Sequence, residues 1–423
     1  MEQLLSPRCY NSTYFDFKRG RMHMDLERIQ QALRDAKLTG WLFYDFRKTN
    51  PIAYKIVGLP STAFYSRRWF YYVPAQGTPT AVISAVEPHV LSELPGKRLI
   101  FQTWQDMHAH LRTILPANGR VAMEYSPHNA VPYVSKVDAG TVELIRSFGV
   151  EVVSSGNLAQ RFEVQLSQAQ VESHREAGRR LIAAKDKLLA QLGEDLRNGV
   201  ELNEYSVQMR LRDLIVAQGI QLPDSPHVAV NANASNPHYE SNSHTHSPIR
   251  RGDLILLDFW GYMPPSEDCD SVFADYTWMA FAGTYDEIPG RQKEVFEIVR
   301  QARDTGIAFA RQRAKAGKPI EGREVDDATR NVINQAGYGR YFVHRTGHNI
   351  GNASTAVHGN GANVDNFETQ DERNLLPNTC CSIEPGIYLP EFGIRSEVDL
   401  LVLENDVEVT GVPIQQEIVA LLS

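Results

Sequence analysis

Several features that define specialised classes of protein are scarce in this chain. There are four cysteines in 423 residues, and Cys380 and Cys381 are adjacent, so they cannot easily form a disulfide with each other. The sequence thus shows neither the disulfide framework of a secreted domain nor a zinc ribbon. No apolar run approaches the roughly 20 residues that cross a bilayer, and the first residues lack the pattern of a signal peptide. We therefore expect a cytoplasmic protein without a membrane partner.

Basic residues are also fewer than acidic ones. The 43 lysines and arginines are outnumbered by 51 aspartates and glutamates, which gives a formal net charge of −8. Proteins that bind nucleic acid present a basic face to the phosphates, so we expect no nucleic-acid partner. The phosphate-binding loops of nucleotide enzymes and the Gly-x-Ser-x-Gly motif of serine hydrolases are missing as well.

What the chain does contain is the composition of a globular protein, with 42% hydrophobic and 22% charged residues. From about Met24, helix and strand patterns alternate. Residues 26–38 have the apolar spacing of a helix. Strand patterns follow at 39–46, 69–75, 80–86 and 120–125. We predict an irregular arm over residues 1–24 and an α/β domain over residues 25–160.

The second half opens with the pattern of a long helix. Ser167 and Gln170 form a capping-box sequence, and apolar residues recur after them at steps of three and four. Further helices are predicted at 203–218, 291–315 and 324–336, with strand-like hairpins between and after them. Helices that alternate with antiparallel hairpins indicate an α+β domain, which we place over residues 161–423.

The segment "SIEPGIYLPEFGIRSEV" predicts a hairpin with two glutamates in apolar surroundings. A turn centred on Pro-Glu pairs Leu389 with Phe392, and the same register places Glu384 opposite Glu397. Cross-strand neighbours have Cβ atoms roughly 5 Å apart, and like charges placed there are destabilising. Some compensating group is therefore required.

A second hairpin repeats this pattern, because Asp258 lies in "DLILLDFW" and Asp275 in "SVFADYTWMAF". Any one of these acids alone would ordinarily form a hydrogen bond or salt bridge at a strand end. Burying four carboxylates costs several kcal/mol each unless they are paired or bind a metal. Arg395 is the main basic residue nearby and cannot neutralise all four. One or two divalent cations could.

Histidines complete the candidate metal site. "HRTGHNIG" places His344 and His348 four residues apart beside glycines, which allow close approach of the backbone. No His-Glu-x-x-His motif is present, which excludes a thermolysin-like zinc helix. With four carboxylates to join, His348 becomes a plausible fifth ligand. Such a site suits Mn²⁺, Co²⁺, Fe²⁺ or Zn²⁺, and five ligands can hold a metal pair through bridging carboxylates.

Six motifs in a fixed order then resemble one superfamily, that of creatinase, aminopeptidase P, prolidase and methionine aminopeptidase, the M24-type metallopeptidases. The motifs are "PHYESN", "RRGDLILLDFW", "FADYTW", "HRTGHNIG", "SIEPGIY" and "IRSEVDLLV". Any one is a weak signal, whereas six in order are specific. The resemblance implies an α/β N-terminal creatinase/prolidase-like domain, an α+β pita-bread catalytic domain and a homodimer.

The resemblance also implies roles for single residues. It places the ligands of two divalent metal ions, with Mn²⁺ preferred, on Asp258, Asp275, His348, Glu384 and Glu397. Glu384 would in addition transfer protons during catalysis.

The same resemblance suggests roles for three histidines and for two residues behind the metal ligands. His238 and His358 are similar to histidines that contact the substrate and assist at the reaction centre. Arg395 resembles an arginine that steadies the second glutamate and is also a candidate for substrate binding, and Thr277 resembles a hydroxyl behind the ligands. For His344 two roles stay open, substrate contact and structural hydrogen bonding.

The function that this implies is a dinuclear-metal exopeptidase that cleaves short peptides at their N-terminal side, with a preference for Xaa-Pro bonds. Departures from the family pattern, notably Phe259-Trp260 after the first aspartate, are expected to reshape the pocket wall, which puts specificity in doubt rather than metal binding. The alternative is the same fold and metal site acting as a hydrolase or lyase on a small non-peptide zwitterion. A non-enzymatic binding module and metal-free catalysis are disfavoured because all five ligands are present.

Overall fold

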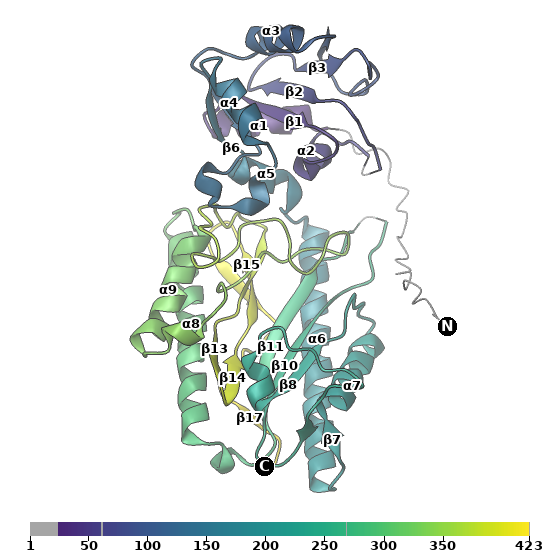
Figure 1. The fold of residues 1–423 in the computed structure, drawn as a ribbon. Coiled ribbons are helices and arrows are strands. Elements are labelled where there is room, and N and C mark those ends of the chain that lie inside the picture. Colours follow the sequence, from purple (N-terminus) through teal and green to yellow (C-terminus); the bar gives the residue numbers. More distant parts are fainter. Residues whose placement is uncertain (1–23, 61, 268, 423) are drawn as a thin grey trace, which may run out of the picture.

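The computed structural model describes residues 24–60, 62–267 and 269–422. Apart from Met24, the predicted N-terminal arm lies outside the described residues. Figure 1 shows a smaller N-terminal part, in purple and blue, stacked on one end of a larger C-terminal part. In the described portion of the chain, no helix combines the length and apolarity needed to cross a bilayer.

The N-terminal part is a six-stranded sheet with helices on both faces. Its strand order is β4-β3-β2-β1-β5-β6. The strands are β1 (Gly40–Asp45), β2 (Trp69–Pro74), β3 (Thr80–Ser84), β4 (Lys97–Phe101), β5 (Arg120–Met123) and β6 (Glu151–Ser154). The helices are α1 (Leu26–Asp35), α2 (Pro51–Ile56), α3 (Trp104–Ile114), α4 (Ala139–Arg146) and α5 (Gly156–Glu163).

The alternation of side chains along β1 explains why helices cover both faces of the N-terminal sheet. Successive side chains of a strand point to opposite faces. Trp41 and Phe43 therefore pack with α1, α2 and α5, whereas Leu42 and Tyr44 pack with α3 and α4. The predicted α/β character of this region is thus explained by an apolar run buried on both sides.

The C-terminal part begins with the predicted long helix. Ser167 accepts a hydrogen bond from the backbone N–H of Gln170, whose side chain accepts one from the N–H of Ser167, so the predicted capping box is confirmed. The helices of this part are α6 (Gln168–Arg197), α7 (Glu204–Ala217), α8 (Gly290–Lys315) and α9 (Gly322–Gln335). Figure 1 shows α6 and α7 on one side of the central strands and α8 and α9 on the other.

The central strands form three groups, with orders β17-β11-β10-β8, β12-β15-β16 and β13-β14, beside a short β7-β9 pair. The first contains β8 (His227–Val230), β10 (Leu254–Tyr262), β11 (Phe273–Phe281) and β17 (Val419–Ala420). The others are β12 (Cys380–Ile383), β13 (Gly386–Leu389), β14 (Phe392–Arg395), β15 (Val398–Val402), β16 (Val407–Thr410), β7 (Leu202–Asn203) and β9 (Pro248–Ile249).

The hairpin register predicted from the turn is confirmed. Leu389 faces Phe392 in the β13–β14 ladder. The β12–β15 ladder continues the same register, since Ile383 faces Val398. Glu384 and Glu397 lie between the two ladders and are therefore opposite each other, as the sequence indicated.

A buried histidine joins α6 to the central strands. The side chain of His174 is fully buried, with Nδ1 2.6 Å from the carbonyl oxygen of Phe273 and Nε2 2.8 Å from Oγ1 of Thr410. The first contact requires Nδ1 to carry the hydrogen, so the neutral ring suits both partners. Burial lowers the pKa of His174 from 6.5 to about 4.

This histidine should make the stability of the protein sensitive to mild acid. Between pH 6.5 and 4 the unfolded chain binds a proton that the folded chain excludes, so the contribution of His174 is present above pH 6.5 and is lost as the pH falls through this window. In urea unfolding with chelator present, the wild type should lose about 2 kcal/mol more than His174→Gln between pH 7 and pH 5. The exposed control His89→Gln should behave like the wild type. Equal losses in all three proteins would contradict this assignment.

Candidate metal centre

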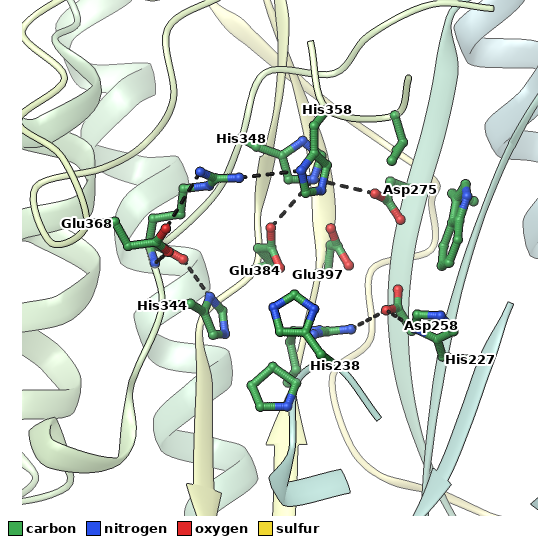
Figure 2. Close-up of a pocket in the computed structure, with 15 residues that line it drawn as sticks. His227, His238, Asp258, Asp275, His344, His348, His358, Glu368, Glu384 and Glu397 are labelled. Atoms are coloured by element: carbon green, nitrogen blue, oxygen red, sulfur yellow. Dashed lines mark hydrogen bonds and ion pairs between the residues drawn. The ribbon is translucent and has the colours of Figure 1, made fainter. Parts of the chain in front are cut away.

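A cavity of about 470 Å³ lies among the central strands of the C-terminal part. With the exception of Thr277, which is buried behind the wall, all of the site residues predicted from the sequence line this cavity. Figure 2 shows His238, His344, His348 and His358 around the carboxylates of Asp258, Asp275, Glu384 and Glu397.

The β10–β11 ladder sets the two aspartates on the cavity face. Asp258 pairs with Thr277 and Trp260 pairs with Asp275, so the aspartates are diagonal neighbours on one face of the sheet. Phe259 is fully buried on the opposite face, in the core beneath α6 and α7. The expectation that Phe259 and Trp260 together reshape the pocket wall is therefore wrong for Phe259, because alternation along a strand exposes only Trp260 to the cavity.

Three of the predicted ligands form a compact group. Ligand atoms of Asp275, His348 and Glu397 all lie within 4.8 Å of one another, and all three residues are buried. His348 Nε2 is 3.5 Å from Asp275 Oδ2 and 3.7 Å from Glu384 Oε1. Nδ1 of His348 is 3.1 Å from the carbonyl oxygen of Asn349, so Nδ1 carries the hydrogen and Nε2 keeps its lone pair for a ligand.

Two predicted ligands lie outside this group: Glu384, already described beside His348, and Asp258. Oδ2 of Asp258 accepts a hydrogen bond from the Arg395 guanidinium and is 3.7 Å from His227 Nδ1. Burial alone would raise the pKa of Asp258, but Arg395 and His227 more than offset it, and the pKa is about 2. This carboxylate is therefore ionised at any pH near neutrality.

Arg395 differs in one respect from the sequence expectation. The resemblance predicted that it steadies Glu397, but its ion pair is with Asp258. Arg395 Nε also donates to Oγ1 of Thr277 at 2.8 Å, and this hydroxyl donates to Oε2 of Glu397 at 2.7 Å. The guanidinium thus reaches Glu397 through the hydroxyl that the sequence had placed behind the ligands, and its charge also partly offsets the raised pKa of Glu397.

The electrostatics of the cluster favour a cation. Burial raises the pKa of Asp275, Glu384 and Glu397, and the charges of neighbouring carboxylates raise these values further. Burial should lower the pKa of His348, yet Asp275 and Glu384 outweigh it and the pKa is raised. Positive charge is therefore stabilised at the centre of the group.

A divalent metal ion fits these residues. Oδ1 of Asp275 is buried and has no hydrogen-bond partner among the described residues, although buried polar atoms are nearly always paired. Carboxylate oxygens together with one imidazole nitrogen form a donor set that first-row divalent ions accept. Asp275, His348 and Glu397 are thus chemically and spatially suited to such an ion.

The remaining predicted histidines differ in their surroundings. His238 is exposed and points into the cavity (Figure 2). His358 is also exposed, and its ring centroid is 3.9 Å from that of His348. The charge of His348, with partial burial and Arg345, lowers the pKa of His358 to about 3. Each is placed to meet a molecule in the cavity.

His344 has protein partners on both ring nitrogens. Nδ1 is 2.7 Å from the carbonyl oxygen of Arg345, and Nε2 is 2.7 Å from the hydroxyl of Tyr388. Burial and the charge of Arg395 lower the pKa of His344 to about 3, so the ring is neutral. Of the two roles left open by the sequence, these contacts favour structural hydrogen bonding.

Three further ionisable residues of the lining were missed by the sequence analysis, namely His227, Arg345 and Glu368. His227 faces Asp258 in the β8–β10 ladder, so a predicted pairing of these two strands could have found it. Arg345 lies within the "HRTGHNIG" motif, but an arginine between two histidines has no distinctive spacing. Glu368 comes from an irregular segment with no periodic signal.

Comparison with known proteins identifies relatives of the chain. The family model described as metallopeptidase family M24 matches residues 172–404. The probable dipeptidase PepE of Mycobacterium bovis is 26% identical over 343 residues, which are 79% of this chain and 80% of the relative. The Xaa-Pro dipeptidase of Lactobacillus helveticus is 35% identical over 175 residues, 40% of each chain.

Solved structures show the same fold. Dipeptidase PepE from Mycobacterium ulcerans matches with a TM-score of 0.57 and 22% identity, covering 94% of this chain and 97% of the other. An X-prolyl aminopeptidase from Caenorhabditis elegans, described as cytosolic with a di-nuclear active site, has a TM-score of 0.57 and 18% identity, covering 92% and 62%. These matches confirm the predicted fold class, an N-terminal α/β domain followed by an α+β pita-bread catalytic domain.

Thr277 offers a direct test of the hydrogen bonds behind the ligands. Thr277→Val removes the hydroxyl that joins Arg395 to Glu397 while preserving side-chain shape. We expect Mn²⁺ affinity, measured by isothermal titration calorimetry, to fall about 10- to 100-fold. The control Thr329→Val, which alters a buried threonine of α9 that bonds only within its helix, should bind metal like the wild type. Unchanged affinity in Thr277→Val would refute the role of this hydroxyl.

Proposed function

The chain belongs to metallopeptidase family M24, and from this premise we propose that it is an exopeptidase that removes or splits short peptides at their N-terminal side and prefers Xaa-Pro bonds. The observation that carries the proposal is the group of Asp275, His348 and Glu397 beside Glu384 at the base of the cavity. The names of the relatives, dipeptidase, Xaa-Pro dipeptidase and X-prolyl aminopeptidase, support a short peptide as substrate.

Family membership implies divalent metal ions as cofactors. We propose that two ions, with Mn²⁺ preferred over Co²⁺, Zn²⁺ or Fe²⁺, are held by Asp258, Asp275, His348, Glu384 and Glu397. When bound, they would lower the pKa of a water molecule and polarise the scissile carbonyl. We also propose a cytoplasmic location, by analogy with the cytosolic X-prolyl aminopeptidase, and a homodimer, which the family resemblance implies.

Glu384 is suited to accept and return a proton. Its side chain is 14% exposed and faces the cavity, while Oε1 accepts a hydrogen bond from the hydroxyl of Ser382 at 3.1 Å. Burial raises the pKa of this carboxyl, which moves a carboxylate toward the range in which it acts as a base near neutral pH. Glu384 would take a proton from the attacking water and deliver it to the leaving amine.

His238 and His358 would stabilise the negative charge that develops on the carbonyl oxygen. Nδ1 of His358 is 3.5 Å from the guanidinium of Arg345 and so acts as an acceptor. Its hydrogen is therefore on Nε2, which is free to donate to a substrate oxygen. Donors aimed at such an oxygen favour the transition state over the bound substrate.

Neither alternative function gains support from the structure or the relatives. A hydrolase or lyase of small zwitterions would have the same ligands, but the relatives are named as peptidases. A binding module without activity is disfavoured because the ligand residues are all in place around the cavity.

A panel of peptides tests the proposed function. The Mn²⁺-loaded chain should hydrolyse Gly-Pro or Gly-Pro-Ala much faster than Gly-Ala. Activity should disappear in chelator and return when Mn²⁺ is added. If the metal-loaded chain hydrolyses none of the three peptides, the peptidase proposal fails and the small-zwitterion alternative replaces it.

The proton-transfer role of Glu384 gives a separate prediction. Glu384→Gln should lower kcat by about 10²- to 10⁴-fold, because the amide cannot accept the proton. Circular dichroism and thermal unfolding should show a retained fold, and elemental analysis should report the remaining metal. Glu391→Gln, an exposed glutamate in the turn of the same hairpin, is the matched control and should keep full activity. A Glu384→Gln enzyme within twofold of the wild type would exclude this role.

A further inference from the structure

The cavity lining includes two arginines, and their partners differ. Arg395 is paired with the carboxylate of Asp258. Arg345, whose side chain is 14% exposed, donates from NH1 to the hydroxyl of Tyr133 at 2.9 Å and lies 3.5 Å from Nδ1 of His358. Both of these partners are uncharged groups. Because a guanidinium has five N–H donors, Arg345 retains hydrogen-bonding capacity toward the cavity.

The carboxylate nearest to Arg345 among its described ion-pair contacts belongs to Glu368. Oε2 of Glu368 is 3.9 Å from NH1, at the outer limit of an ion pair, while Oε1 accepts the backbone N–H of Arg345 at 2.9 Å. Glu368 is therefore held near the guanidinium without a close side-chain hydrogen bond to it. A carboxylate that enters the cavity would therefore meet the guanidinium of Arg345, whose positive charge Glu368 neutralises only weakly at this distance.

The N-terminal part of the chain fixes this arrangement. Tyr133 belongs to the short 3₁₀ helix η2 (Pro132–Val134), 212 residues before Arg345. The segment that carries Glu368 is attached to the same region, because the N–H of Gln370 donates to the carbonyl oxygen of Ala130 at 3.0 Å. Residues 130–133 thus hold both the guanidinium and its acidic neighbour at the edge of the catalytic cavity.

The charged side chains of the cavity lining lie on two sides of the central glutamates. In Figure 2, Glu368 and His344 lie on one side of Glu384 and Glu397, and Asp258 and His227 lie on the other. The contacts of Arg345 with Glu368 and His358 place its guanidinium on the first side, whereas Asp258 on the second side is already paired with Arg395. Arg345 therefore remains open to the free carboxylate of a dipeptide. The volume of about 470 Å³ is also modest among ligand pockets, which range from roughly 300 to 1,000 Å³.

We propose that Arg345 binds the C-terminal carboxylate of the substrate, that Tyr133 positions Arg345 for this purpose, and that the chain consequently acts on free dipeptides in preference to longer or C-terminally blocked peptides. This inference rests on the proposed function and narrows its substrate class. Guanidinium and carboxylate match in geometry and form charge-assisted, often bidentate hydrogen bonds. Glu368 competes with the substrate for the same cation.

The test compares Ala-Pro with Ala-Pro-amide, which differ in the terminal carboxylate. In the metal-loaded wild type, kcat/KM for Ala-Pro should exceed that for the amide by about 10- to 100-fold. Arg345→Gln should abolish most of this difference, mainly by raising KM for Ala-Pro. Tyr133→Phe, which removes only the hydroxyl, should reduce the difference in the same direction and by a smaller factor.

Glu368→Gln should change KM for Ala-Pro in the direction opposite to that expected for Arg345→Gln. The amide oxygen can still accept the backbone N–H of Arg345, but the competing charge is removed, so KM for Ala-Pro should fall while KM for the amide changes little. The control Tyr125→Phe alters a half-buried tyrosine of the same N-terminal region that stacks on Arg146. It should leave the kinetics with both substrates unchanged.

The outcomes separate the inference from the proposed function. If the wild type hydrolyses both substrates equally well, or if Arg345→Gln, Tyr133→Phe and Glu368→Gln all keep the wild-type ratio, the carboxylate site is refuted while the peptidase function stands. If Arg345→Gln does not fold, Tyr133→Phe and Glu368→Gln decide the question. If the wild type hydrolyses neither substrate, the peptidase function fails and this inference with it.

Discussion

Repulsion among buried carboxylates is the constraint on which the C-terminal half depends. The hairpin register places Glu384 opposite Glu397, and the β10–β11 ladder brings Asp258 and Asp275 to the same cavity. One arginine compensates one of these acids, and burial raises the pKa of the other three. Without further positive charge this arrangement would cost several kcal/mol. The divalent cations that we propose for this site would remove that cost and supply the chemistry of a metallopeptidase.

The surrounding fold converts this electrostatic constraint into a defined site. Helices on both sides keep the strands in place, while the alternation of each strand separates its core face from its cavity face. Thr277 and Arg395 link ligands that come from different sheets. The N-terminal part contacts a lining residue of the same cavity, because Tyr133 accepts a hydrogen bond from Arg345 across 212 residues of sequence.

Local patterns were predictable from the sequence, and contacts between distant segments were not. The capping box at Ser167 and the turn that pairs Leu389 with Phe392 are encoded within a few residues, and both are confirmed. Strands β4 and β6 were missed because they are the two edges of the N-terminal sheet and β4 is largely exposed, which weakens the apolar pattern. The pairing of Arg395 with Asp258 was missed because it depends on how two hairpins meet.

Among the predicted ligands, residue type and apolar surroundings selected the four acids from the amino-acid sequence, because a buried acid in a strand is rare and four are rarer. His348 was added as a fifth candidate because it lies beside glycines in its motif. The central claim is that cations hold these side chains together. Elemental analysis of the purified chain after equilibration with Mn²⁺ and removal of free metal measures this directly. The account predicts two divalent ions per chain, and a smaller amount in Asp275→Asn. A wild-type chain that retains no divalent metal would contradict it.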